Sequence, residues 1–83
     1  MKKEILIKFG QKVRERRAEL GLSQEELASR AGVHRTYIGM IERAEKNITL
    51  ENIEKISKAL KLNIDDLMKN LWPIQTRKLN KKS

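Results

Sequence analysis

The sequence predicts an all-α fold, a compact domain of five short helices packed around one aliphatic core. Two observations lead to it: apolar residues recur at steps of three and four over most of the chain, and Gly, Ser, Thr or Asn stands at the breaks between these runs. The 83 residues suffice for a single core, which must be aliphatic because the chain has one Phe, one Tyr and one Trp. We expect the folded domain over residues 1–72 and a basic, flexible tail over residues 73–83.

The first helix is predicted over residues 3–19. Phe9, Val13 and Leu20 follow the three- and four-residue steps of an amphipathic helix. Gly21 suits the end of this helix, because glycine adopts a left-handed conformation without steric cost.

The second helix is predicted to begin after Ser23. Ser23 followed three residues later by Glu26 forms the capping-box pattern, in which each side chain bonds to the other residue's backbone amide. Gly32 is expected to end this helix. Its buried face consists of small and aliphatic residues: Leu27, Ala28 and Ala31.

The third helix is predicted from about His34 to Arg43, and the fourth begins at Thr49 or Leu50. The polar stretch AEKN connects the two. The fourth helix has a single apolar stripe, with Leu50 leading into it: Ile53, Ile56 and Leu60.

A fifth short helix is predicted in LNIDDLMKNLW, with Asn63 as its N-cap and Leu67 and Leu71 on one face. Pro73 marks its limit, because the residue before a proline is disfavoured in helical conformation. The basic segment beyond Pro73 has too little apolar content to fold alone.

The net charge of +8 is concentrated near the two ends of the chain. Residues 1–22 carry seven Lys/Arg and three Glu, residues 73–83 carry four Lys/Arg and no acidic residue, and the charges between them balance. Such an excess favours a polyanionic partner such as nucleic acid, although basic residues also serve solubility. Double-stranded DNA is favoured over RNA, because the chain lacks the aromatic platforms on which RNA bases stack.

Other classes of protein are disfavoured by what the chain lacks. There is no glycine-rich phosphate loop or catalytic set, His34 is the only histidine, and Asp65 and Asp66 are adjacent, so we expect neither an enzyme nor a cofactor, metal or small-molecule ligand. The chain has no cysteine and no apolar run long enough to span a membrane. The short run Ile5–Ile7 is not followed by the pattern of a cleavable leader, and we expect a cytoplasmic protein.

Residues 23–43 have the spacing of a helix-turn-helix, in which the second helix lies in the major groove of DNA. Ala28 is small enough for a close helix crossing, and Gly32 permits the sharp turn that follows. Ile38 and Ile41 are placed to pack the third helix onto the second.

The segment GLSQEELASRAGVHRTYIGMIERAEKN resembles the helix-turn-helix of phage repressors and Cro-type regulators, and is most similar to the controller proteins of restriction–modification systems. The family pattern covers about residues 6–70. The resemblance implies a repressor-like domain and a sequence-specific transcription regulator. Such a regulator is a homodimer on an inverted-repeat operator near its own promoter, activating at low level and repressing when more sites fill. An antitoxin that neutralises a partner toxin and autoregulates its operon is the alternative, since such proteins can share this fold.

Arg35 and Thr36 are the expected base readers, because they stand at the N-terminal end of the third helix, where residues face the groove. The arginine fork matches the two acceptors of guanine, and threonine offers a hydroxyl and a methyl group. His34 is expected to cap the helix or to contact phosphate. Other residues of this face are assigned to phosphate or flanking contacts: Ser23, Gln24, Tyr37, Arg43, Lys46 and Asn47.

Within that set, Arg43 is the one expected to reach a base, and Gln24 is also expected to brace the recognition helix, as in similar repressors. Gly39 and Met40 depart from the family pattern. They stand where other members often have polar base readers, so DNA shape is expected to contribute to specificity.

The resemblance implies an ion pair of Arg17 with Glu42 that ties the first helix to the third. Glu25 occupies a position that in related activators faces RNA polymerase, whereas a first-turn glutamate favouring the helix dipole is the simpler interpretation. The C-terminal part of the domain has more apolar residues than its own core needs, and these are expected to form a dimer interface unless they complete the monomer core: Leu62, Ile64, Met68, Leu71 and Trp72.

Overall fold

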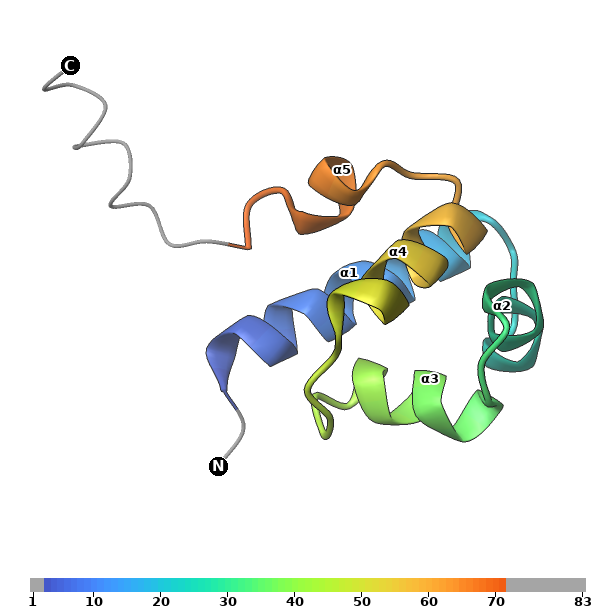
Figure 1. Ribbon diagram of the computed structural model, residues 1–83, viewed down its shortest axis with the longest axis horizontal. Coiled ribbons are helices and arrows are strands. Elements are labelled where there is room, and N and C mark those ends of the chain that lie inside the picture. The colour runs from blue at the N-terminus through green and yellow to red at the C-terminus, as the bar shows by residue number, and fades with distance from the viewer. Residues whose placement is uncertain (1–2, 72–83) are drawn as a thin grey trace, which may run out of the picture.

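The computed structural model describes residues 3–71, and this part of the chain is all-helical with no strand. The five helices confirm the predicted fold class (Figure 1). Their bounds are α1 (Glu4–Glu19), α2 (Gln24–Ala31), α3 (Arg35–Glu42), α4 (Leu50–Ala59) and α5 (Ile64–Met68).

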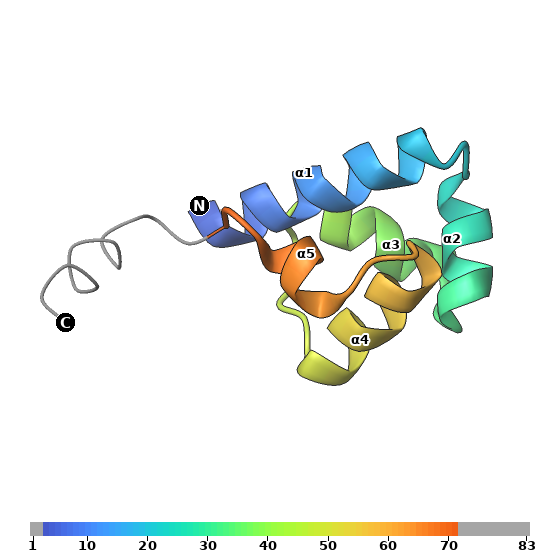
Figure 2. The ribbon, with the colours of Figure 1, turned by 90° about the horizontal axis from the view of Figure 1, so that it is seen from above.

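The helices surround one core, and the arrangement leaves one long face of α3 at the surface. α3 packs against α1 and α2, α2 also packs against α4, and α5 closes over α1 and α4. Figure 2 shows α5 in front and α3 behind, with α1 and α4 on opposite sides and α2 standing across one end of the bundle.

Each helix contributes at least one fully buried aliphatic side chain to the core. Truncating such a residue to alanine costs about 2–5 kcal/mol for Leu or Ile, because the cavity it leaves closes only partly. The most deeply buried aliphatic residues are Val13, Leu27, Ile38, Ile56, Leu60 and Leu67.

The N-termini of α2 and α4 are capped by side chains, and the cap of α2 is the one that the sequence predicts. Ser23 and Glu26 form both hydrogen bonds of the capping box, and the hydroxyl of Thr49 accepts from the amide of Asn52 at 3.1 Å. Asn63 stands at the predicted N-cap position of α5, but its side chain makes no capping hydrogen bond. The short α5 is held instead by burial of Leu67.

All five helices are followed by a residue in the left-handed conformation. Gly21 and Gly32 adopt it after α1 and α2, with φ of 70° and 72°. The stops after α3, α4 and α5 are not glycines but Ala44, Lys61 and Asn70, with φ of 61°, 59° and 64°. A side chain in this conformation costs roughly 1–2 kcal/mol unless it is asparagine or aspartate.

Two expectations about the apolar stripes need correction. Leu50 does not lead into the core, because its side chain is 79% exposed at the first position of α4. Leu71 lies beyond the end of α5 at Met68, yet it is buried against the core at 3% exposure. Trp72, Pro73 and the basic tail lie outside the described residues.

Candidate nucleic-acid interface

The turn between α2 and α3 is built by Gly32, whose φ of 72° places it in the left-handed region. The amide of Val33 then donates back to the carbonyl of Ala28 at 3.0 Å, which satisfies one of the last acceptors of α2. At the other end of α2, the amide of Glu26 donates to the Ser23 hydroxyl at 3.0 Å, and the amide of Ser23 donates to the Glu26 carboxylate at 2.8 Å. These hydrogen bonds fix both ends of α2, and the turn at Gly32 leads directly into α3.

α3 divides its residues between core and surface as a recognition helix does. Ile38 and Ile41 are buried against the other helices, whereas Arg35 and Thr36 are exposed at the first turn. The predicted base readers therefore lie on the face that is free to enter a groove.

His34 occupies the N-cap position of α3, but its side chain makes no capping hydrogen bond. The capping role expected of His34 is therefore not present, because a ring at this position does not accept from the first-turn amides as Ser or Asp does. The side chain is exposed beside Arg35 and remains available to a phosphate.

Five residues from α2, α3 and the end of α3 line a shallow hollow on this surface. Its volume is about 270 Å³ and its lining is Gln24, Arg35, Thr36, Gly39 and Arg43. Four of the five were assigned to DNA from the sequence. The structure thus brings the predicted readers and the predicted phosphate contacts of Gln24 and Arg43 to one place.

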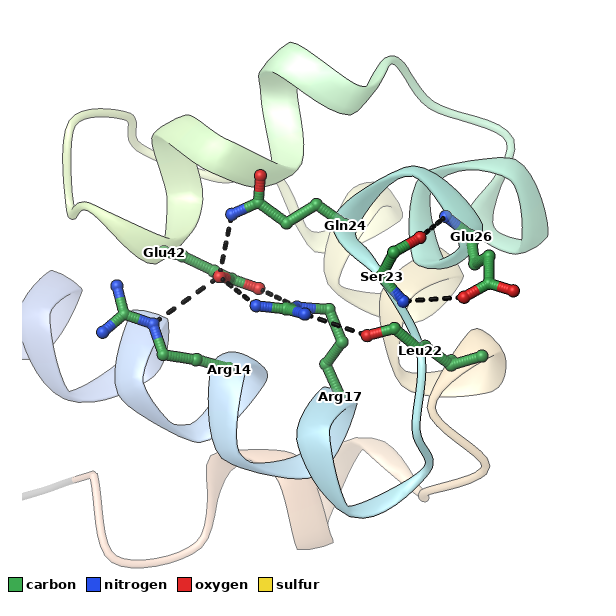
Figure 3. Close-up of polar contacts among 7 residues, drawn as sticks. All are labelled: Arg14, Arg17, Leu22, Ser23, Gln24, Glu26 and Glu42. Carbon is green, nitrogen blue, oxygen red and sulfur yellow. Dashed lines mark hydrogen bonds and ion pairs between the residues drawn. The ribbon is translucent and has the colours of Figure 1, made fainter.

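The C-terminal end of α3 is anchored by Glu42, whose side chain is only 1% exposed. Arg17 of α1 holds this carboxylate with two hydrogen bonds, Nε to Oε2 at 2.7 Å and Nη2 to Oε1 at 3.0 Å. Gln24 donates from Nε2 to Oε1 at 3.0 Å, and Nε of Arg14 lies 3.7 Å from the same oxygen (Figure 3). The carboxylate therefore joins α1, α2 and α3 at one point.

Burial alone would raise the pKa of Glu42. Hydrogen bonds from Arg17 and Gln24, together with the positive charges of Arg17 and Arg14, outweigh it and hold the pKa of the Glu42 carboxyl below its ordinary value. The hydrogen bond to Glu42 in turn raises the pKa of Arg17. Glu42 is thus a charged, fully partnered group in the folded protein near neutral pH.

The sequence analysis places Arg17 with Glu42 and expects Gln24 to brace the recognition helix, which its hydrogen bond to Glu42 does. It does not include Arg14. Arg14 has no signal in a single sequence, because only the packed structure shows which of the basic residues of α1 lies near Glu42; its side chain stays 57% exposed. Arg17 also donates from Nη1 to the carbonyl of Leu22 at 2.9 Å, a backbone contact that no side-chain pattern reveals.

The remaining predicted DNA contacts lie outside this hollow. Tyr37 is half-buried, and its hydroxyl accepts from Nδ2 of Asn52 at 2.9 Å, leaving the hydroxyl proton for another acceptor. Lys46 and Asn47 are exposed on the connection between α3 and α4. Asn52 was not singled out from the sequence, where it reads as an ordinary helix residue.

The residues expected at a dimer interface differ in exposure. Ile64 is 40% exposed, and Leu62 and Met68 are half-buried. Leu71 belongs to the core of the single chain, so it is removed from the proposed dimer surface, and Trp72 lies outside the described residues.

Residues 3–71 contain no helix that is long and apolar enough to cross a membrane. Within the same residues there is no cluster of three or more His, Cys, Asp or Glu side chains that could hold a metal ion.

The chain matches known proteins over most of its length. Residues 13–67 match the family model described as helix-turn-helix. Control protein C.BamHI of Bacillus amyloliquefaciens is 51% identical over 69 residues, which cover 82% of this chain and 85% of that protein. Control protein C.SmaI of Serratia marcescens is 46% identical over 66 residues, covering 80% of this chain and 75% of that protein.

Solved structures give the same result. The restriction–modification controller protein C.AhdI from Aeromonas hydrophila superposes with a TM-score of 0.73 at 47% identity, covering 75% of this chain and 94% of that one. The controller protein C.Esp1396I, as a tetramer in complex with its natural 35 base-pair operator, gives a TM-score of 0.78 at 33% identity, covering 84% of this chain and 92% of that one. The resemblance inferred from the sequence is confirmed.

Proposed function

The chain belongs to the helix-turn-helix family of DNA-binding transcription regulators, and we propose that it acts as a restriction–modification controller protein, a homodimer that binds an inverted-repeat operator near its own promoter. The observation that carries the proposal is the exposed first turn of α3. Arg35 and Thr36 stand free on a helix that the cluster around Glu42 holds in place. A helix that reads DNA bases needs exposed polar side chains and must itself be held rigidly by the rest of the domain.

Dimerisation follows from the size of the reading surface, because one recognition helix covers only a few base pairs. Two copies related by two-fold symmetry place their recognition helices about 34 Å apart, one turn of the duplex. The apolar residues around the start of α5 supply the proposed contact. They are Leu62, Ile64 and Met68.

The alternative of an antitoxin is not favoured. The relatives named above are controller proteins, and one of them is seen on its operator. Isolation of this protein in a stoichiometric complex with a second, unrelated chain would revive that alternative.

RNA polymerase is proposed as a second partner through Glu25, which lies exposed in the first turn of α2. Glu25→Gln would then lower activated transcription from a reporter while leaving operator affinity unchanged. Unchanged activation would reduce Glu25 to a residue that favours the helix dipole.

The proposed function is tested by selection of the purified protein against a randomised duplex pool, followed by titration of the selected duplexes at several salt concentrations. An enriched inverted repeat with half-site centres about one helical turn apart supports a dimeric reader. Absence of enrichment, with binding that disappears as salt rises, would leave only non-specific attraction by the basic residues.

A further inference from the structure

Two glycines lie inside helices, and their surroundings differ. A β-carbon on Gly10 of α1 would come 2.5 Å from the carbonyl oxygen of Ile41 and 2.9 Å from that of Glu42. These are backbone atoms of α3, so the close packing of α1 on α3 requires a glycine at position 10.

No such requirement exists at Gly39 in the middle of α3. The nearest atoms outside its own helix backbone are side-chain ends, Nη1 of Arg43 at 3.1 Å and Oε1 of Gln24 at 3.6 Å from the position of a β-carbon. The contact with Gln24 is an ordinary van der Waals distance, and only the guanidinium end of Arg43 has to give by a few tenths of an ångström. Since glycine inside a helix is less stable than alanine, the fold gains nothing from Gly39.

What Gly39 does create is the hollow on the reading face. The missing side chain leaves the floor, and the rim is formed by Arg35 and Thr36 on one side and by Arg43 and Gln24 on the other. Nε of Arg43 also lies 3.1 Å from a carboxylate oxygen of Glu45, which restrains the arginine at the rim.

We propose that this hollow receives the 5-methyl group of a thymine in the major groove, with the thymine O4 accepting from a guanidinium group of the rim. The inference rests on the proposed function and makes Gly39 a specificity-determining position of this chain. Specificity here comes from an absent side chain rather than from an added polar one.

The chemistry of the rim and floor selects thymine among the four bases. The guanidinium groups of Arg35 and Arg43 donate and do not accept, so beside them an acceptor such as thymine O4 is favoured over the amino groups that adenine and cytosine present. Guanine offers two acceptors but no group that projects into a hollow. Thymine alone places an acceptor beside an apolar methyl group in the major groove.

The test uses the selected operator with each thymine of a half-site replaced in turn by deoxyuridine, which lacks only the methyl group. For the unmodified protein, we expect one position where the replacement weakens binding about fourfold, the worth of one buried methyl group. For Gly39→Ala, the new methyl occupies the floor of the hollow, where the thymine methyl would lie. We therefore expect weaker binding to the thymine operator and recovery on the deoxyuridine operator at that same position.

The matched control is Gln11→Ala, an exposed site on α1 outside the reading face, which should keep the response of the unmodified protein. Thermal unfolding of Gly39→Ala should occur at or above the temperature of the parent protein, so that weaker binding is not a folding defect. A protein that selects an operator yet responds to no thymine replacement, or a Gly39→Ala variant that responds as the parent does, overturns the inference alone. Failure to select any operator overturns the proposed function and the inference with it.

Discussion

Glu42 at the end of α3 and Arg17 in α1 meet through two hydrogen bonds of 2.7 and 3.0 Å, with the carboxylate almost completely buried. The pair does not face the DNA side of α3. Its effect is on position: it fixes the recognition helix relative to the long helix that crosses the domain.

Replacing Glu42 by alanine should lower the free energy of unfolding by about 3–5 kcal/mol, because Arg17 is left as a part-buried charge without its partner. Urea denaturation followed by circular dichroism measures the change. Glu19→Gln is the control, since Glu19 pairs with Arg16 at 3.1 Å on the surface and is 65% exposed. That variant should lose at most about 0.5 kcal/mol, and an equal loss in both variants would contradict the role of burial.

The lowered pKa of Glu42 predicts a specific pH dependence. A carboxyl group whose pKa is depressed by folding stabilises the protein fully above its unfolded-state pKa, near the ordinary value of 4.5, and the contribution is lost as the pH falls through the folded-state pKa. The stability difference between the parent protein and Glu42→Gln should therefore be constant around neutral pH and shrink below about pH 4.5.

The comparison with Glu42→Gln is needed because Glu26 titrates over the same range. Its hydrogen bonds with the backbone and side chain of Ser23 also lower its pKa. Glu26 is present in both proteins, so its contribution cancels in the difference. A difference that stays constant down to pH 3 would show that folding does not lower the pKa of Glu42.

Gly10→Ala should destabilise the domain by about 1–3 kcal/mol, although alanine is the better helix former. The added carbon would meet the α3 carbonyls of Ile41 and Glu42, and α1 must move away from α3 to admit it. Denaturant unfolding measures the loss, with Gln11→Ala as the neighbouring exposed control. A Gly10→Ala protein as stable as its parent would show that the α1–α3 contact is looser than described.

Arg35→Ala and Lys46→Ala should weaken DNA binding in different ways. Loss of a base reader at Arg35 should cost about 1–3 kcal/mol on the selected operator and relax the preference at one base pair. Loss of a phosphate contact at Lys46 should weaken all duplexes alike and reduce the salt dependence by about one unit of slope. Competition binding against single base-pair variants of the operator distinguishes a base reader from a phosphate contact. If Arg35→Ala weakened binding to all duplexes alike, Arg35 would not be a base reader.

Ile64→Ser should raise the dimer dissociation constant, because it removes an exposed apolar side chain from the proposed contact. Sedimentation equilibrium measures the constant. Ile7→Ser offers a matched control, since Ile7 is also an exposed isoleucine, at 44% against 40% for Ile64, and lies on α1. If both variants dimerise as the parent does, the contact lies elsewhere on the surface.

The sequence predicted most accurately those features that depend on local chemistry. Ser23 with Glu26 and the turn at Gly32 are determined within a few residues, and each lies where the pattern indicated. The apolar steps likewise identified Ile38 and Ile56 as core residues. Arg17 with Glu42 required the family resemblance, because no local pattern joins residues so far apart in the chain.

The features that the sequence did not predict depend on packing between helices. Leu50 has the residue type of a core position but lies one turn too early on α4 to face inward. The ends of α3 and α4 carry Ala44 and Lys61 in place of glycine, so no stop signal was present. The closeness of Arg14 to Glu42 is set by the tertiary arrangement alone.

The contrast between Gly10 and Gly39 has an evolutionary consequence. Position 10 admits no side chain without displacing α3, so it is closed to change while the fold is kept. Position 39 meets only the ends of two side chains, so a small residue can replace its glycine once the end of Arg43 shifts by a few tenths of an ångström. Substitutions at position 39 can therefore change the operator preference within a lineage of such regulators, while the fold that positions the recognition helix is kept.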